Sequence, residues 1–99
     1  MKISDLKPYQ PIDEIVVTVV EVSPVKEFTK FGMTGRVLTA LIEDNSGKIN
    51  LMLWDDQVES VKLGDKIRIT DGYVKEYKGE MQVNVGRQGE IVVLKQKVL

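Results

Sequence analysis

The chain has 99 residues, a length that suits a single compact domain. It contains no cysteine and no histidine, which excludes disulfide scaffolds, zinc fingers, thiol catalysis and the Ser-His-Asp triad. The 14 Lys and Arg residues are balanced by 15 Asp and Glu residues, for a formal net charge of −1. Binding to nucleic acid would therefore depend on where the charges lie, because their sum provides no attraction.

The chain shows no repeat and no linker-like stretch, which predicts one domain over residues 1–99. Within it we expect an N-terminal extension at 1–11 and a short C-terminal end at 95–99. The apolar runs are only a few residues long, so no membrane span is predicted. The N-terminus lacks the apolar core of a signal peptide, which favours an intracellular location without a membrane partner.

Residues 1–35 predict one helical turn, one long strand and a loop. Ser4 is placed to cap a single helical turn that Pro8 would end. The chain becomes β-rich from residue 12, and residues 15–22 are mostly β-branched and nearly apolar on both faces, which predicts a long first strand that is central or strongly curved. Residues 23–35 are polar and contain proline and glycine, so we expect a loop there.

A hairpin is predicted in the middle of the chain. The second strand is expected over 36–43 and the third over 48–54, on either side of an Asp-Asn-Ser-Gly turn. In this turn Gly47 is free to adopt a positive φ. Residues 55–63 are polar with two valines three positions apart, which fits a short helix or a turn.

The fourth strand is expected over 66–77. Ile67 and Ile69 lie on one face of it, and Val74 joins that face only if the register slips once between them. The Asp-Gly pair at 71–72 is the natural place for a β-bulge that causes such a slip.

The fifth strand follows a tight Lys-Gly turn at 78–79 and is expected over 80–85. Residues 86–89 contain two glycines and should break the strand, and 91–94 should form a last short edge. The resulting order, three strands, a short helix and two strands with short connections, predicts an all-β domain.

Strand alternation predicts which side chains face away from the core. In the third strand the aliphatic residues alternate with an outward set: Asn50, Met52 and Trp54. In the fourth strand the outward set is Tyr73, Lys75 and Tyr77. The neighbouring strands add Thr39, Gln82 and Asn84. These residues form a predicted outward face that combines flat rings with amide groups.

Such a face provides what an unstacked nucleobase needs, namely a π surface and a few polar groups at its edge. Two structural explanations stay open at this stage. A rim segment or a terminal strand could cover Trp54, and the two tyrosines could close one end of a barrel.

Several cationic residues lie on or beside the strands that form the predicted outward face. Lys26, Lys30 and Arg36 lie in or beside the predicted loop, together with the aromatic Phe31. A second group lies along the fourth strand, in the turn after it and at the end of the fifth strand: Lys75, Lys78 and Arg87. Because many acids lie elsewhere, a net charge of −1 is compatible with a basic groove, although scattered charge is the alternative.

Three segments carry a resemblance to a known family: residues 44–56 (DNSGKINLMLWDD), 63–69 (LGDKIRI) and 72–79 (GYVKEYKG). Their order and spacing resemble the single-stranded-DNA-binding proteins with one OB domain, the archaeal and eukaryotic forms related to replication protein A. The resemblance extends over residues 6–87. It implies a five-stranded OB-fold Greek-key barrel that holds single strands across its second and third strands.

The resemblance also implies that bases stack at the positions of Trp54, Tyr73 and Tyr77. Some relatives carry an aromatic residue at the position of Asn84, or tryptophan at that of Tyr73, so stacking is expected to be weaker here. Relatives often continue into a flexible tail that recruits protein partners in DNA replication or repair, whereas this sequence stops at Leu99. Location would be cytoplasmic in an archaeon or nuclear in a eukaryote.

These observations predict a binding module without cofactor, metal or catalytic residues, which coats single-stranded DNA with little sequence preference in replication, recombination or repair. Lysines and arginines would neutralise phosphates, and the amides would bond to base edges. One domain should cover on the order of 4–5 nucleotides. Single-stranded RNA or tRNA binding and a protein-interaction role are the alternatives. We favour a monomer and leave the oligomeric state open.

An enzyme has little support in the sequence. The Gly-Met-Thr-Gly stretch at 32–35 lacks the lysine and the helix of a phosphate-binding loop. Asp55 and Asp56 form a carboxylate pair, but adjacent acids at the end of a strand more often cap a helix than bind a metal.

Overall fold

The computed structural model describes residues 1–96, so the last three residues of the C-terminal end expected at 95–99 lie outside the described part. The elements in chain order are η1 (Ile3–Asp5), β1 (Pro11–Val22), β2 (Lys26–Lys30), β3 (Met33–Asp44), β4 (Gly47–Trp54), η2 (Asp55–Glu59), β5 (Lys66–Tyr77) and β6 (Glu80–Lys95). Over this range, no helix has both the length and the apolar character needed to cross a membrane.

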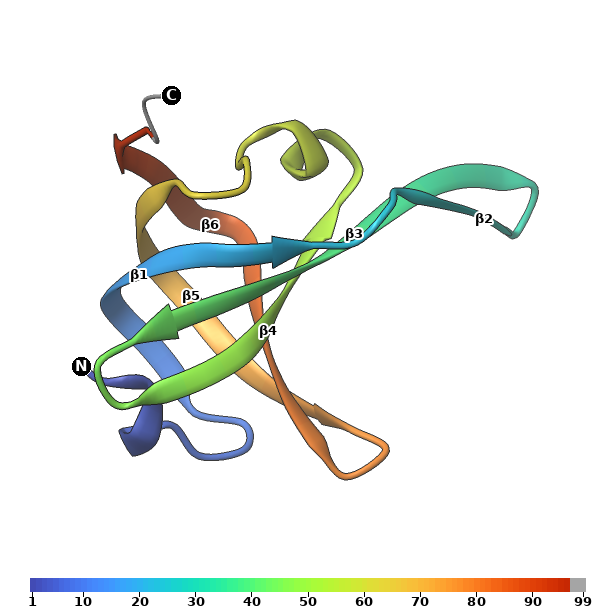
Figure 1. Cartoon of the computed structure of the whole chain (residues 1–99). Helices are drawn as coiled ribbons and strands as arrows, with labels where there is room; N and C mark the ends of the chain where they lie inside the picture. Colours follow the sequence, from blue (N-terminus) through green and yellow to red (C-terminus); the bar gives the residue numbers. More distant parts are fainter. Residues whose placement is uncertain (97–99) are drawn as a thin grey trace.

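The strands form a closed barrel (Figure 1). The hydrogen-bonded order is β1-β5-β6-β4-β3, and a further pairing of β1 with β3 closes the ring. The β4–β6 pair is parallel and the other pairs are antiparallel. A five-stranded barrel with this topology and a short 3-10 turn between β4 and β5 is the OB fold, which confirms the predicted fold class.

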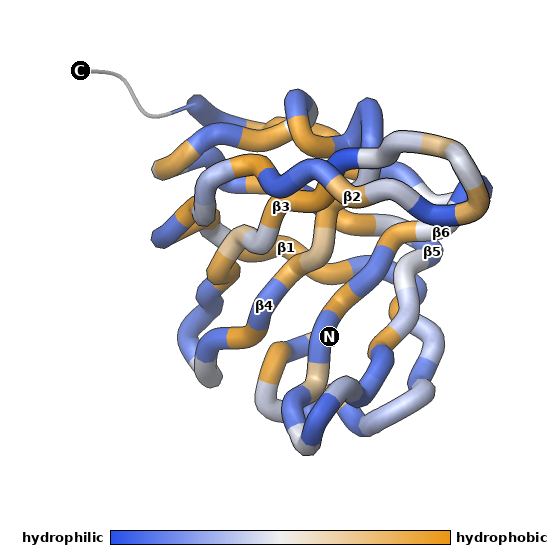
Figure 2. The backbone as a smooth tube through the Cα atoms, turned by 90° about the vertical axis from the view of Figure 1, so that its right-hand side faces the viewer, coloured by the Kyte–Doolittle hydropathy of each residue, from blue (hydrophilic) through white to orange (hydrophobic). Residues whose placement is uncertain are grey.

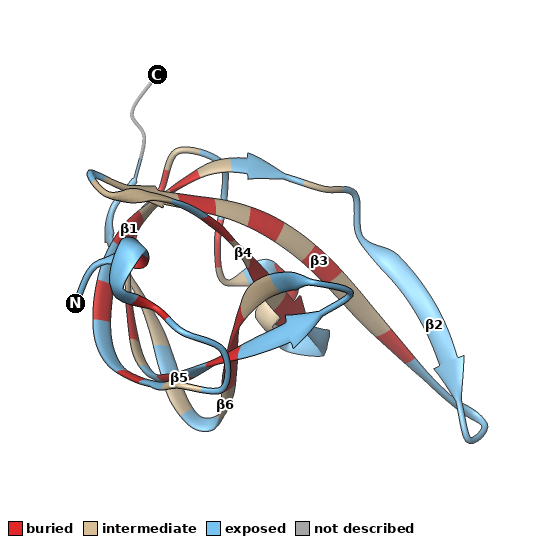
Figure 3. Ribbon diagram, turned by 90° about the horizontal axis from the view of Figure 1, so that it is seen from below, coloured by how far each residue is buried: buried red, intermediate tan, exposed pale blue. Residues whose placement is uncertain are grey.

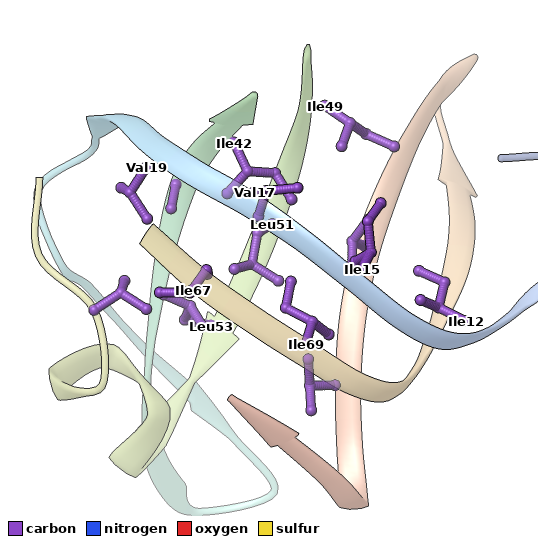
Figure 4. Close-up of a cluster of buried hydrophobic side chains, with 14 of the residues drawn as sticks. Ile12, Ile15, Val17, Val19, Ile42, Ile49, Leu51, Leu53, Ile67 and Ile69 are labelled. Atoms are coloured by element: carbon purple, nitrogen blue, oxygen red, sulfur yellow. The ribbon is translucent and has the colours of Figure 1, made fainter. Parts of the chain in front are cut away.

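The core follows the predicted alternation of side chains. Figure 4 shows aliphatic side chains from the barrel strands pointing into one interior cluster. Buried and more exposed residues alternate along β3 in Figure 3, and hydrophobic and hydrophilic residues alternate along the tube in Figure 2. In β4 the inward residues are Ile49, Leu51 and Leu53, as predicted. The opposite face of the same strands is therefore free to form a site.

The first strand is long and curved, as its two apolar faces predicted. β1 pairs with β5 from Pro11 to Thr18 and with β3 from Thr18 to Val22. A register shift between Val19 and Glu21 lies in the pairing with β3, where a β-bulge bends the strand. One strand can thus pair with two neighbours and close the barrel.

The predicted loop at 23–35 was wrong. This stretch contains β2 and the start of β3, which pair from Lys26 with Val37 to Lys30 with Met33. Phe31 and Gly32 form the turn with positive φ values of 53° and 75°. The hairpin extends away from the barrel in Figure 1, and every residue of β2 is exposed. Its sequence therefore shows no burial pattern that could have predicted a strand.

Two details of the turns also differ from prediction. Ser4 lies inside η1 and does not cap it, since the N-cap position is Lys2 and no side chain bonds there. Gly47 does not adopt a positive φ. Instead the Asp44 carboxylate closes the turn by accepting hydrogen bonds from the N–H groups of Ser46 and Gly47.

The second half of the barrel matches prediction except at one strand end. The expected bulge lies between Thr70 and Gly72, and the turn at 78–79 is tight, with positive φ at both residues. The predicted break at 86–89 was wrong, because β6 continues to Lys95. Those residues lack paired partners in β5, so the glycines mark a bend within one strand rather than its end.

The N-terminal segment contributes to the core. Ile3 and Leu6 are both buried in the main hydrophobic cluster, and the Ile3 N–H donates to the Asp44 carboxylate at 2.9 Å. Residues before β1 therefore close one end of the barrel.

Candidate nucleic-acid interface

Cross-strand register places most of the predicted outward residues in two adjacent rows on the outer face of the barrel. The first row comprises Thr39, Met52, Asn84 and Tyr73. The second row comprises Leu41, Asn50, Gln82 and Lys75. Residues that are distant in sequence thus become neighbours because β6 lies between β4 and β5.

A groove of about 990 Å³ lies on this face. The predicted residues that line it are Met52, Trp54, Tyr73, Lys75, Tyr77, Gln82 and Asn84. Thr39 and Asn50 line a smaller, neighbouring hollow of the same face. The Thr39 hydroxyl donates to the Met52 sulfur at 3.6 Å, which connects the two hollows.

Trp54 is held at the end of β4 by contacts on several sides. Its side chain is 41% exposed, so no rim segment of the described chain covers it. The indole Nε1 donates to Asn84 Oδ1 at 3.0 Å, and the ring meets that of Phe28 edge-on with 5.9 Å between centroids. The Gln57 side chain accepts from the Trp54 N–H at 3.1 Å and donates to the Val85 carbonyl at 2.8 Å. The ring is therefore oriented before any ligand arrives.

Phe28 is a positioning residue that the sequence analysis did not select. It lies opposite Gly35 in the hairpin and covers it, because a Cβ built on Gly35 would lie 2.4 Å from the Phe28 ring. Its ring then meets Trp54. The usable sequence signal was a glycine facing an aromatic residue across a hairpin, and this signal requires the strand pairing to be known.

The two tyrosines of β5 lie outward, as predicted, with 37% of Tyr73 and 60% of Tyr77 exposed. A lysine ammonium lies over each ring. Lys75 Nζ is 5.8 Å from the Tyr73 centroid, and Lys78 Nζ is 5.3 Å from the Tyr77 centroid. Each pair combines a flat ring with a cation near its face, so one position offers both stacking and charge neutralisation.

Asn84 lies on the predicted face, but it is buried, whereas an exposed side chain had been expected. Only 4% of the residue is accessible. Alternation assigned the correct face, but Asn84 occupies the centre of a row between Met52 and Tyr73 and bonds to Trp54 above it. Its Oδ1 is used by that bond, and its Nδ2 is buried without a hydrogen-bond partner.

The remaining predicted cations and Phe31 lie outside the groove lining. Lys30 and Phe31 are at the hairpin tip, with Lys30 Nζ 5.7 Å from the ring of Phe31, which is 92% exposed. Arg87 is exposed in the bend of β6, and Lys78 is in the β5–β6 turn.

Arg36 lies against η2 rather than at the groove. Its guanidinium is 3.5 Å from the Glu59 carboxylate and 4.0 Å from that of Asp56, and it donates to the Asp55 carbonyl at 3.3 Å. The Arg36 N–H donates to the Asp55 carboxylate at 3.1 Å, so this acid ties β3 to η2. The acids of η2 are therefore matched by a cation of the same chain.

Two groove residues were not predicted, namely Tyr9 and Glu76, whereas Lys26 and Val37 had been placed among the cations and on the outward face and do line the groove. Tyr9 precedes β1 and has a positive φ of 63°, and its N–H donates to the Val74 carbonyl at 2.8 Å. Its place at the groove follows from that contact with β5, which no local sequence pattern indicates.

A closed OB barrel with an outer groove lined by aromatic rings, lysines and amides defines an OB-fold domain with an open binding face. The chain matches the family described as "Single-stranded DNA binding protein Ssb-like, OB fold" over residues 6–93, and it belongs to this family. The family resemblance expected from the sequence is confirmed.

Two curated relatives agree with this family assignment. The chain is 27% identical over 90 residues to the single-stranded DNA binding protein Ssb of Saccharolobus solfataricus, covering 91% of this chain and 61% of the relative. It is 29% identical over 96 residues to replication factor A of Methanothermobacter thermautotrophicus, covering 93% of this chain and 12% of that protein. The chain thus spans less than two thirds of the length of either relative.

Solved structures agree on the fold. A crystal structure of a domain of replication protein A from Methanococcus maripaludis has a TM-score of 0.80 and 30% identity, covering 97% of this chain and 96% of that one. A solution structure of the second OB-fold domain of the same protein has a TM-score of 0.79 and 29% identity, covering 100% and 98%.

Proposed function

We propose that this domain binds single-stranded DNA along the groove of β4, β5 and β6. The observation that carries the proposal is one continuous hollow whose four aromatic residues include Trp54, Tyr73 and Tyr77, with lysine ammonium groups beside these two tyrosines. Every base has a flat π face that can stack on an aromatic ring, so binding depends little on sequence. The family and the names of both curated relatives support single strands as the ligand and replication as the setting.

Stacking supplies most of the affinity in this proposal. Each base that stacks on an aromatic side chain contributes about 1–3 kcal/mol. The groove contains Lys26 and Lys75 against one acid, Glu76, so its local charge is only weakly positive. Few counterions are then released, and the affinity should fall only modestly as the salt concentration rises.

The domain acts as a binding module rather than an enzyme. Its groove presents rings, amides and lysines, which hold a strand in place through stacking, hydrogen bonds and phosphate neutralisation. Nothing in this chemistry requires a bond of the strand to be broken or formed.

The test uses Trp54, the single tryptophan of the chain. Titration with oligo-dT should quench its fluorescence, because a stacked base contacts the indole directly. In an anisotropy assay with labelled oligo-dT, Trp54→Ala should weaken binding by about 1–3 kcal/mol. Leu94→Ala is the control, since Leu94 is similarly exposed but lies outside the groove lining.

Two results would contradict the proposal. The first is the absence of quenching at low salt, and the second is an equal effect of the two alanine substitutions. A parallel titration with oligo-U of equal length tests RNA, and tighter binding of the RNA would reassign the ligand.

A further inference from the structure

We propose that Asn84 selects among bases in this groove by donating a hydrogen bond from its Nδ2 to a carbonyl oxygen of the stacked base. The inference rests on the proposed function and adds to it a specificity-determining residue. Sequence preference would then be weak but not absent, with one donor group responsible for it.

The orientation of the Asn84 amide is fixed by Trp54. An indole N–H can only donate, so its 3.0 Å bond to Asn84 must be accepted by the amide oxygen, Oδ1. The nitrogen end of the amide is thereby turned away from Trp54. Without this bond the amide could rotate by half a turn and offer its oxygen instead. Trp54 therefore has a second role besides stacking, which is to hold Asn84 as a donor.

The donor that results has no partner. Among the buried side-chain nitrogen and oxygen atoms of residues 1–96, Asn84 Nδ2 is the one without a hydrogen bond. Folded proteins rarely leave a buried donor unpaired, because the group has lost its water and gained nothing in return. An acceptor brought in by a ligand would satisfy it without breaking any existing bond. Asn84 lines the groove where that ligand would lie.

A base can reach Nδ2 only if a neighbouring side chain moves. Met52 and Tyr73 flank Asn84 in the same cross-strand row, and both are partly exposed. Methionine has three rotatable bonds and repacks at little cost, so Met52 can move aside while Tyr73 provides a surface for stacking. The hydrogen bond would thus form only with a base that has already entered the groove.

A lone donor discriminates by the acceptors that a base presents. Thymine, cytosine and guanine each carry a carbonyl oxygen, whose two lone pairs accept over a broad range of angles. Adenine has no carbonyl oxygen, and its acceptors are ring nitrogens with one in-plane lone pair each, two of them beside the amino group, so fewer of its orientations satisfy the donor. The structure therefore predicts tighter binding of carbonyl-bearing bases than of adenine.

The experiment isolates this hydrogen bond from stacking. The probes are an oligomer of thymidine and an oligomer of equal length built from 2,4-difluorotoluene deoxynucleotides, which keep the shape of thymine but have no carbonyl group. The measured quantity is the ratio of the two dissociation constants. The unsubstituted protein should prefer thymidine by about three- to tenfold, the size of one net hydrogen bond.

Two variants test the residues. In Asn84→Leu the ratio should fall to about one, because a side chain of similar volume has replaced the donor. In Trp54→Phe the ratio should fall as well, since the ring is kept but Asn84 is no longer locked. Gln88→Leu is the matched control, because Gln88 is an exposed amide on the same strand outside the groove lining, and it should keep the unsubstituted ratio.

The outcomes separate this inference from the proposed function. If the unsubstituted protein binds neither oligomer, the proposed function fails. If it binds both equally, or if its preference persists in Asn84→Leu, the role of Asn84 is refuted while DNA binding stands. A preference that persists in Trp54→Phe refutes the locking of the amide by Trp54. Thermal unfolding shows whether Asn84→Leu is folded, and if it is not, Asn84→Asp replaces it, because a carboxylate keeps an oxygen for the Trp54 N–H but has no donor.

Discussion

Adding one methyl group at Gly35 should weaken DNA binding while the barrel stays folded. A Cβ at this position would lie 2.4 Å from Phe28 Cζ and 2.9 Å from the two neighbouring ring carbons. Contacts this short cannot persist, so the Phe28 ring must leave its place over residue 35. The ring belongs to an exposed hairpin, and it can swing into solvent without disturbing the core.

The expected loss follows from the contact that Phe28 makes with Trp54. Their rings meet edge-on at 5.9 Å and 83°, and such aromatic pairs contribute about 0.5–1.5 kcal/mol beyond the area they bury. If this contact orients Trp54 for stacking, Gly35→Ala should weaken binding by a similar amount, about two- to tenfold in dissociation constant. The free energy of unfolding should change by less, since no core residue moves.

The assay is anisotropy titration with oligo-dT, together with urea unfolding of each variant. Gly47→Ala is the matched control, because a Cβ there meets only an Ile3 carbon at 3.7 Å and Gly47 has no positive φ. Phe28→Ala should reproduce the binding loss, and the double variant should be no weaker than either single one. Additive losses, or equal affinities of Gly35→Ala and Gly47→Ala, would refute the role of Phe28.

Three further predictions concern the bend of β6, the Asp44 turn and the unequal roles of two cations. Gly89→Ala should lower the free energy of unfolding in urea by about 1–3 kcal/mol, because its Cβ would lie 2.7 Å and 3.0 Å from backbone oxygens of β5. A loss no greater than that of Gly47→Ala would contradict this prediction. Burial alone would raise the pKa of Asp44. Hydrogen bonds from the Ser46 hydroxyl and from the N–H groups of residues 3, 46 and 47 lower the pKa by more than that, so it lies below the ordinary value of 3.8. Asp44→Ala should therefore cost about 1 kcal/mol at pH 7, and the difference in melting temperature from the unsubstituted protein should shrink as pH falls below about 4, whereas a constant difference would count against it. Lys75→Ala should lower the salt dependence of DNA affinity by about 0.7 in log–log slope, and Arg36→Ala should leave it unchanged because Arg36 is already paired with acids. An unchanged slope in Lys75→Ala, or a lowered slope in Arg36→Ala, would contradict this.

The sequence predicted an all-β domain and its outward face because both depend on strand alternation, whereas the OB barrel was what the family resemblance implied. A period of two assigns Trp54 and Tyr77 to the face opposite Leu53 and Val74 without any knowledge of the strand order. The bulge before Gly72 was predictable for the same reason, because only a slip in register keeps the apolar residues in phase.

What the sequence could not predict depends on pairing and on contacts between strands. The β2 hairpin has no buried side, so its residues lack the alternation by which strands are detected. Strand alternation predicts the face on which Asn84 lies but not its burial. The burial depends on the neighbouring strands, β4 and β5, whose residues flank Asn84. Arg36 seemed free in sequence because its acidic partners, Asp56 and Glu59, follow some twenty positions later.

The groove is formed jointly by the barrel and the hairpin. The barrel fixes the backbone of Trp54 and Asn84, and the hairpin brings Phe28 against the Trp54 ring. A series of direct contacts therefore runs from Gly35 through Phe28 and Trp54 to the unpaired donor of Asn84. β2 has no buried residue of its own, and this aromatic contact couples the hairpin to the groove wall in addition to the pairing of Lys26 with Val37. Stacking on Trp54 and base selection by Asn84 then both depend on the position of the Trp54 ring, so a substitution in the hairpin should change both the affinity for DNA and the preference among bases.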